Sequence, residues 1–106
     1  MEIKDIQTIE EFQSVVTENE QILLLKHSLT CPISGSANQA FQQFREDSEI
    51  PLYRLYVQNA RELSTYIANT YQIKHESPQV IQFVDGDAIW DTSHFDITAD
   101  NFKKIG

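Results

Sequence analysis

Apolar and polar positions follow one another along the chain in segments of helix and strand length. Residues 8–16, TIEEFQSVV, carry apolar side chains at helical spacing, and Thr8 with Glu11 three residues later makes a capping box. The next segment, QILLLKH at residues 21–27, is a continuous apolar run. Such a run predicts a strand buried on both faces, as in a parallel sheet.

The alternation of helix and strand continues through the middle of the chain. From Pro32 onward the apolar residues return at helical spacing, and a proline suits the first turn of a helix. Residues 51–57, PLYRLYV, are rich in aromatic and branched side chains and predict a second strand. Residues 59–71 then predict an amphipathic helix, with Asn59 as its cap.

The last third of the chain predicts a hairpin followed by a short helix. Residues 80–84, VIQFV, form the third strand, and Asp85-Gly86 is a strong signal for a tight hairpin turn. Residues 88–91 would return as the fourth strand. Thr98 is the expected cap of the final helix, whose apolar residues are Phe102 and Ile105.

The predicted order is α-β-α-β-α-β-β-α, in one α/β domain that spans residues 1–106. A helix joins the first two strands, so they are expected to lie parallel through a right-handed crossover. The last two strands form an antiparallel pair. Together these elements predict a mixed four-stranded sheet flanked by helices.

Composition and charge narrow the range of functions. The chain carries 16 acidic and 8 basic residues, for a net charge of −8, which argues against nucleic acid as a partner. No stretch reaches the roughly 20 apolar residues of a membrane span, and the N-terminus lacks a signal-peptide pattern. A cytoplasmic protein with no membrane partner is expected. The three histidines and one cysteine match no metal-ligand spacing, so no metal is expected.

The single cysteine, Cys31, lies in the segment KHSLTCPISGSAN between the first predicted strand and the second helix. Unpaired N–H groups at a helix start favour a thiolate and lower a cysteine pKa from about 8.5 to roughly 3.5–7.5. Lys26 and His27 are close enough in sequence to add positive potential. Ser34 takes the place of the second cysteine of a Cys-x-x-Cys motif, and its hydroxyl cannot resolve a mixed disulfide. The alternative is that Cys31 is an unreactive core residue.

A second candidate feature is the proline that precedes the third predicted strand, in HESPQV at residues 75–80. In a domain with this order of elements, Pro78 is expected to lie beside Cys31. We expect a cis bond between Ser77 and Pro78, which would expose the Ser77 backbone to an extended thiol ligand.

These features together resemble the thioredoxin fold. The blocks TCPIS, HESPQV and the tail W-x-x-S-H-x-D-I-T at residues 90–98 resemble, more closely, the YtxJ-type monothiol bacilliredoxins. That family is also described as bacillithiol-system redox-active proteins or general stress proteins. The resemblance extends from the first predicted strand to the last helix.

The resemblance implies a monothiol thiol-disulfide oxidoreductase that removes bacillithiol from oxidised client proteins during oxidative stress. Bacillithiol would be a thiol co-substrate, and no cofactor would be bound. Cys31 would be the nucleophile. Because bacillithiol carries a malate group, basic neighbours such as Lys26, Arg54, Lys74 or a protonated histidine would be useful. The residues expected to bind substrate are Thr30, Pro32, Ser34, Ser77, Pro78 and His94.

Two other functions stay open at the level of sequence. The first is a non-enzymatic thioredoxin-like module that binds a partner or senses thiols, since it would need the same accessible thiolate. The second is iron–sulfur binding of the monothiol glutaredoxin type. That family has a C-G-F-S pattern, and Pro32-Ile33 in place of its Gly-Phe pair disfavours this function. His94 has two expected positions: beside the cysteine at the end of the hairpin, or packed under the last helix.

Overall fold

The computed structural model describes residues 3–30 and 32–102. All the predicted elements are present in the expected order, and Ile105 of the last predicted helix lies outside the described residues. In chain order the elements are β1 (Ile3–Asp5), α1 (Ile9–Glu18), β2 (Gln21–His27), α2 (Pro32–Asp47), β3 (Leu52–Tyr56), α3 (Arg61–Tyr71), β4 (Gln79–Val84), β5 (Asp87–Ser93), the 3₁₀ turn η1 (His94–Asp96) and α4 (Ala99–Phe102).

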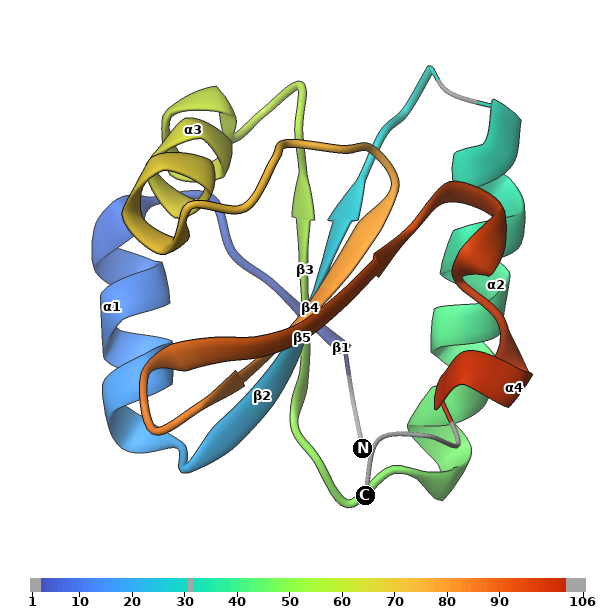
Figure 1. The fold of residues 1–106 in the computed structure, drawn as a ribbon, viewed down its shortest axis with the longest axis horizontal. Coiled ribbons are helices and arrows are strands. Elements are labelled where there is room, and N and C mark those ends of the chain that lie inside the picture. The colour runs from blue at the N-terminus through green and yellow to red at the C-terminus, as the bar shows by residue number, and fades with distance from the viewer. Residues whose placement is uncertain (1–2, 31, 103–106) are drawn as a thin grey trace.

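The strands form one mixed sheet in the order β1-β3-β2-β4-β5. Strands β1, β3 and β2 run parallel, whereas β4 is antiparallel to β2 and β5 is antiparallel to β4. Helices α1 and α3 cover one face of the sheet, and α2 and α4 cover the other (Figure 1). The parallel crossover and the terminal hairpin are therefore confirmed.

The sheet has five strands, so the predicted number of four was wrong. The missing strand is β1, which pairs with β3 from Ile3 opposite Leu52 to Asp5 opposite Arg54. Three residues are too few to show a period of two, and two of them are exposed. Only the hydrogen bonds to β3 make this segment a strand.

Of the three predicted helix caps, two are confirmed and one was wrong. At α4 the Asn101 N–H donates to Thr98 Oγ1 at 3.2 Å, which confirms Thr98. At α1 the capping box is confirmed, because the Glu11 N–H donates to Thr8 Oγ1 and the Thr8 N–H donates to Glu11 Oε1, at 3.1 and 3.2 Å. At α3 the prediction of Asn59 was wrong. The N–H groups of Asn59 and Ala60 both donate to Tyr56 O, and this turn delays the helix start by one residue.

The hairpin turn is confirmed at Asp85 and Gly86. Both residues have positive φ, 52° and 83°, as a type I′ turn requires. Strand β4 is almost entirely buried, whereas β5 at the sheet edge alternates between exposed and partly buried side chains. The return strand is longer than predicted because pairing with β4 extends it to Ser93.

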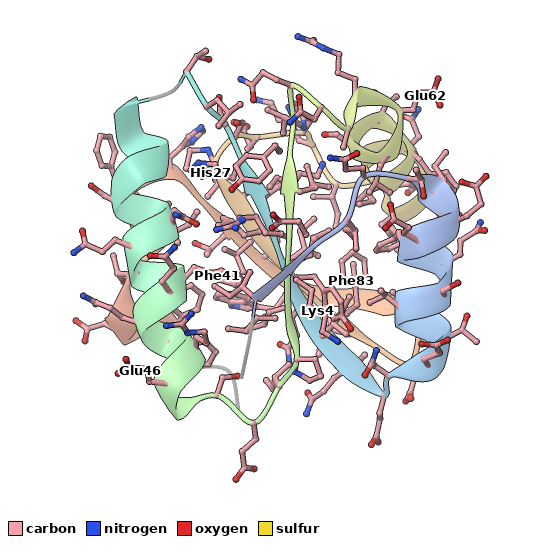
Figure 2. The ribbon with its side chains drawn as sticks, turned by 180° about the vertical axis from the view of Figure 1, so that it is seen from behind. Lys4, His27, Phe41, Glu46, Glu62 and Phe83 are labelled. Carbon is pink, nitrogen blue, oxygen red and sulfur yellow. The ribbon has the colours of Figure 1, made fainter. Side chains whose placement is uncertain are left out.

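Two apolar cores lie on opposite faces of the sheet. Successive residues of β2 point to opposite faces, so Leu24 enters one core while Leu23 and Leu25 enter the other. Figure 2 shows Phe83 on the side of α1 and Phe41 on the side of α2. The sheet is thereby held between two helical layers.

One edge of the sheet gathers the segments that the sequence marked as functional. Strands β2 and β3 both end there, with His27 opposite Tyr56, at the top of Figure 1. Strand β4 begins there, with Gln79 opposite Lys26. The segment before α2 and the segment containing Pro78 therefore lie at the same edge.

Candidate functional site

Cys31 itself lies outside the described residues, so its predicted ionisation stays a prediction. The elements around it are those expected: β2 ends at His27 and α2 begins at Pro32. The backbones of Pro32 and Ser34 lie in the first turn of α2, and their side chains are outside the description.

Residues 28–30, which lead from β2 to Cys31, are held by the side chain of Gln58. Its Nε2 donates to Ser28 Oγ and Thr30 Oγ1 at 3.0 and 3.2 Å, and its Oε1 accepts from the Leu29 N–H at 3.1 Å. Gln58 therefore positions Thr30 from the end of β3. The sequence analysis did not identify Gln58, although the parallel pairing of β2 with β3 was a signal that their ends would meet.

The predicted cis bond between Ser77 and Pro78 is confirmed. Pro78 is buried at the start of β4, and its carbonyl accepts from the His94 N–H at 3.0 Å. Ser77, Pro78 and His94 are thus brought together at the edge where β2 ends.

Two buried polar atoms at this edge have no hydrogen-bond partner in the part of the chain that the structure describes. They are Nδ1 of His27, on the last residue of β2, and Oγ of Ser77. Buried polar groups are nearly always satisfied in folded proteins. Two exceptions at the edge predicted to hold the reaction are consistent with a site that receives a ligand.

His94 lies at the end of the hairpin, beside Pro78. Its Nε2 lies 3.3 Å from Glu76 Oε2, and its φ is 52°. The side chain is 42% exposed, so it contacts the Pro78 segment and solvent rather than packing under the last helix. Glu76 was not identified from the sequence; it also lies 3.4 Å from Lys74 Nζ.

Lys26 points to the α3 side of the sheet and is completely buried. Its Nζ donates to the Ser64 carbonyl at 3.2 Å and lies 3.4 Å from His75 Nδ1, while Ser64 Oγ is 3.1 Å from the same ring nitrogen. Burial lowers the pKa of the Lys26 ammonium to about 8. Lys26 therefore still carries its charge at neutral pH.

Neither His27 nor His75 supplies a comparable charge. Burial and the charge of Arg54 lower the pKa of His27, against the opposing effect of Asp5. Burial and the charge of Lys26 lower the pKa of His75, against the opposing effect of Glu76. Both rings are neutral at pH 7, because an unperturbed histidine titrates near 6.5.

Replacing Lys26 with methionine is expected to change how stability depends on pH. The unfolded chain keeps this proton up to about 10.5 and the folded chain only up to about 8. The unfolded state thus binds more protons between these values, and the free energy of unfolding contributed by Lys26 rises with pH there.

Urea unfolding at pH 7 and pH 10 measures this effect. Relative to Lys26→Met, wild type should gain about 2 kcal/mol between the two pH values. Lys4→Met, at an exposed position on β1, is the matched control and should show no such change. Parallel pH dependence in wild type and Lys26→Met would contradict the burial of a charged lysine.

Arg54, another cation considered from the sequence, is engaged elsewhere. Its Nε lies 2.9 Å from Asp5 Oδ1, its Nη1 donates to Asn38 Oδ1 at 3.0 Å, and its guanidinium lies over the Tyr56 ring. Asp5 compensates its charge, so Arg54 contributes little to the binding of an anion.

Within residues 3–30 and 32–102, no cluster of three or more histidine, cysteine, aspartate or glutamate side chains could hold a metal ion. Over the same residues, no helix has the length and apolar character needed to cross a membrane.

Comparison with known proteins agrees with this architecture. Residues 4–102 match the family of the monothiol bacilliredoxin BrxC. A solved protein described as having a thioredoxin fold and a suggested oxidoreductase activity is 39% identical, with a TM-score of 0.91 over 96% of this chain and 91% of that one.

More distant matches establish the fold alone. An N21Q mutant thioredoxin from Halobacterium salinarum NRC-1 is 16% identical, with a TM-score of 0.81 over 98% of this chain and 87% of its own. A reduced thioredoxin pre-protein from Schistosoma mansoni is 15% identical, with a TM-score of 0.80 over 99% and 95%. The thioredoxin-like fold expected from the sequence is confirmed.

Proposed function

Because the chain belongs to the monothiol bacilliredoxin family, we propose that it removes bacillithiol from mixed disulfides on oxidised client proteins. The observation that carries the proposal is the family match over residues 4–102, in a chain whose one cysteine lies between β2 and α2. The setting is the cytoplasm under oxidative stress, and the partners are bacillithiolated proteins and bacillithiol itself.

In the first step the Cys31 thiolate attacks the bacillithiol sulfur of the mixed disulfide. The bond between that sulfur and the client cysteine breaks, and the client leaves as a thiolate that takes a proton from water. Helix N–H groups at the start of α2 favour the ionised form of the attacking thiol. Cys31 is then joined to bacillithiol by a new disulfide.

In the second step an external thiol must restore the enzyme. Its thiolate attacks the bacillithiol sulfur on Cys31, so a low-molecular-weight disulfide leaves and Cys31 returns as a thiolate. Ser34, at the position of a resolving cysteine, has no sulfur with which to perform this step within the chain.

The remaining site residues have binding roles in this proposal. Ser77, next to the cis-proline, offers backbone groups to the extended thiol ligand. Gln58 holds Thr30 after the end of β2. His94 lies beside the Pro78 segment, where its N–H donates to the Pro78 carbonyl. Pro32 begins the helix whose first N–H groups would favour the thiolate.

Turnover tests the proposal against the alternative of a thiol sensor. A client protein with one bacillithiolated cysteine is supplied in twentyfold excess, together with free thiol as reductant. The enzyme should release many equivalents of client, and a quenched sample should show Cys31 heavier by one bacillithiol. Release that stops after one equivalent would support the sensor instead.

A further inference from the structure

A cleft of about 710 Å³ extends along α3, bounded by that helix and by the segment that follows it, Gln72 to His75. In Figure 1 the loop that contains this segment leaves the end of α3 and runs across the molecule to the start of β4. The volume is within the range of small-molecule sites.

The cleft is positive although the whole chain is acidic. Arg61 and Lys74 line it, and none of the described lining residues carries a carboxylate, in a chain with 16 acidic and 8 basic residues. Arg61 is exposed and forms no ion pair with any residue in 3–30 or 32–102. Lys74 is 88% exposed, so its pair with Glu76 is weak.

A third cation lies behind the wall of the cleft. Ser64 and His75 line the cleft, and both contact the buried Nζ of Lys26. Across the described parts of the chain Lys26 has no carboxylate partner. A buried charge is screened much less than an exposed one, so this ammonium raises the potential in the cleft and favours an anion there.

The cleft also adjoins both halves of the candidate site. Gln58, which lines it, holds residues 28–30 just before Cys31. His75, which lines it as well, stands three residues before Pro78 in the chain. A ligand that extends from the reacting sulfur past Gln58 would enter the cleft.

We propose that this cleft binds the dicarboxylate end of the low-molecular-weight thiol, its malate group, with Arg61 as the principal contact. This inference rests on the proposed function, because it concerns the same substrate. A guanidinium matches a carboxylate through two parallel hydrogen bonds, whereas Lys74 offers a mobile point charge that Glu76 already shares. Arg61 is therefore expected to contribute more than Lys74.

Paired substrates test the proposal on one client protein. The client carries either bacillithiol or neutral 2-mercaptoethanol on the same cysteine. Arg61→Gln should raise KM for the bacillithiolated client about tenfold, the effect of one lost charge-assisted hydrogen bond, and leave the neutral substrate unchanged. Lys74→Gln should raise it about two- to threefold. Lys4→Gln, the same change of charge on β1, should alter neither.

The outcomes separate this inference from the proposed function. Wild type that processes both substrates, with no selective loss in Arg61→Gln, overturns the cleft and leaves the proposed function standing. An equal loss on both substrates also overturns it, because a specific contact with malate would spare the neutral thiol. Wild type that processes neither substrate overturns the proposed function.

A binding measurement keeps the cleft testable without turnover. L-malate is titrated into the Cys31→Ala protein and followed by amide chemical shifts. Shifts should appear at Ser64, Asn69 and His75, and should be absent with the neutral diamide of malate and in an added Arg61→Gln substitution. Equal shifts with malate and its diamide, or no shifts with either, would overturn the inference.

Discussion

The Cys31→Ala protein is expected to release no bacillithiol from a modified client, with kcat/KM reduced by roughly a thousandfold or more. The chain contains one cysteine, so no second thiolate can take over the attack. Ser34, three residues on, carries a hydroxyl that stays protonated at neutral pH. The release of bacillithiol, followed by mass spectrometry of the client, measures the effect.

Two controls make this result specific to the sulfur. Cys31→Ser keeps the size of the side chain and should be as inactive as alanine, since only the nucleophile has changed. Ser36→Ala, an exposed position on α2, should keep full activity. Residual release in either Cys31 variant would mean that another group performs the exchange, and the proposed mechanism would be wrong.

Replacing Phe12 with alanine is expected to lower the free energy of unfolding by about 3–5 kcal/mol. Phe12 is 1% exposed and is the residue through which α1 enters its core. Its ring meets Phe83 edge-on at 5.2 Å and lies 6.3 and 6.2 Å from the rings of Tyr66 and Tyr71. A domain of this size has roughly 5–15 kcal/mol in total, so the loss is a large share.

Phe95→Ala is the matched control, because it removes the same ring from a position that is 79% exposed. Urea unfolding of both variants should show a change near zero for Phe95. A loss below about 1 kcal/mol in Phe12→Ala would show that this aromatic cluster does not hold α1 to the sheet.

Local signals in the sequence located most of the fold. The run at Gln21–His27 predicted β2 with its bounds, and Asp85-Gly86 predicted the hairpin. Each depends on a few neighbouring residues, such as the continuous apolar run or the small side chain of a glycine. The failures, β1 and the cap at Asn59, occurred where hydrogen bonds to β3 or to its last residue decided the outcome.

The candidate site was predictable only in part, for a related reason. Pro78 and Cys31 could be related because the order of elements brings their segments to one edge. Gln58 and Arg61 were not recognised, since an amide and an arginine near a helix start are ordinary in sequence. Their significance comes from residues 28–30, which Gln58 holds, and from the cleft that both line.

The sequence by itself determined the order of helices and strands, the single cysteine and the serine that cannot resolve its disulfide. Those properties depend on composition and on spacings of a few residues. Only the tertiary structure decided that Lys26 is buried against Ser64 and His75, which are 38 and 49 residues away. Whether a charge is hidden, paired or exposed depends on what packs around it, and distant segments supply that packing.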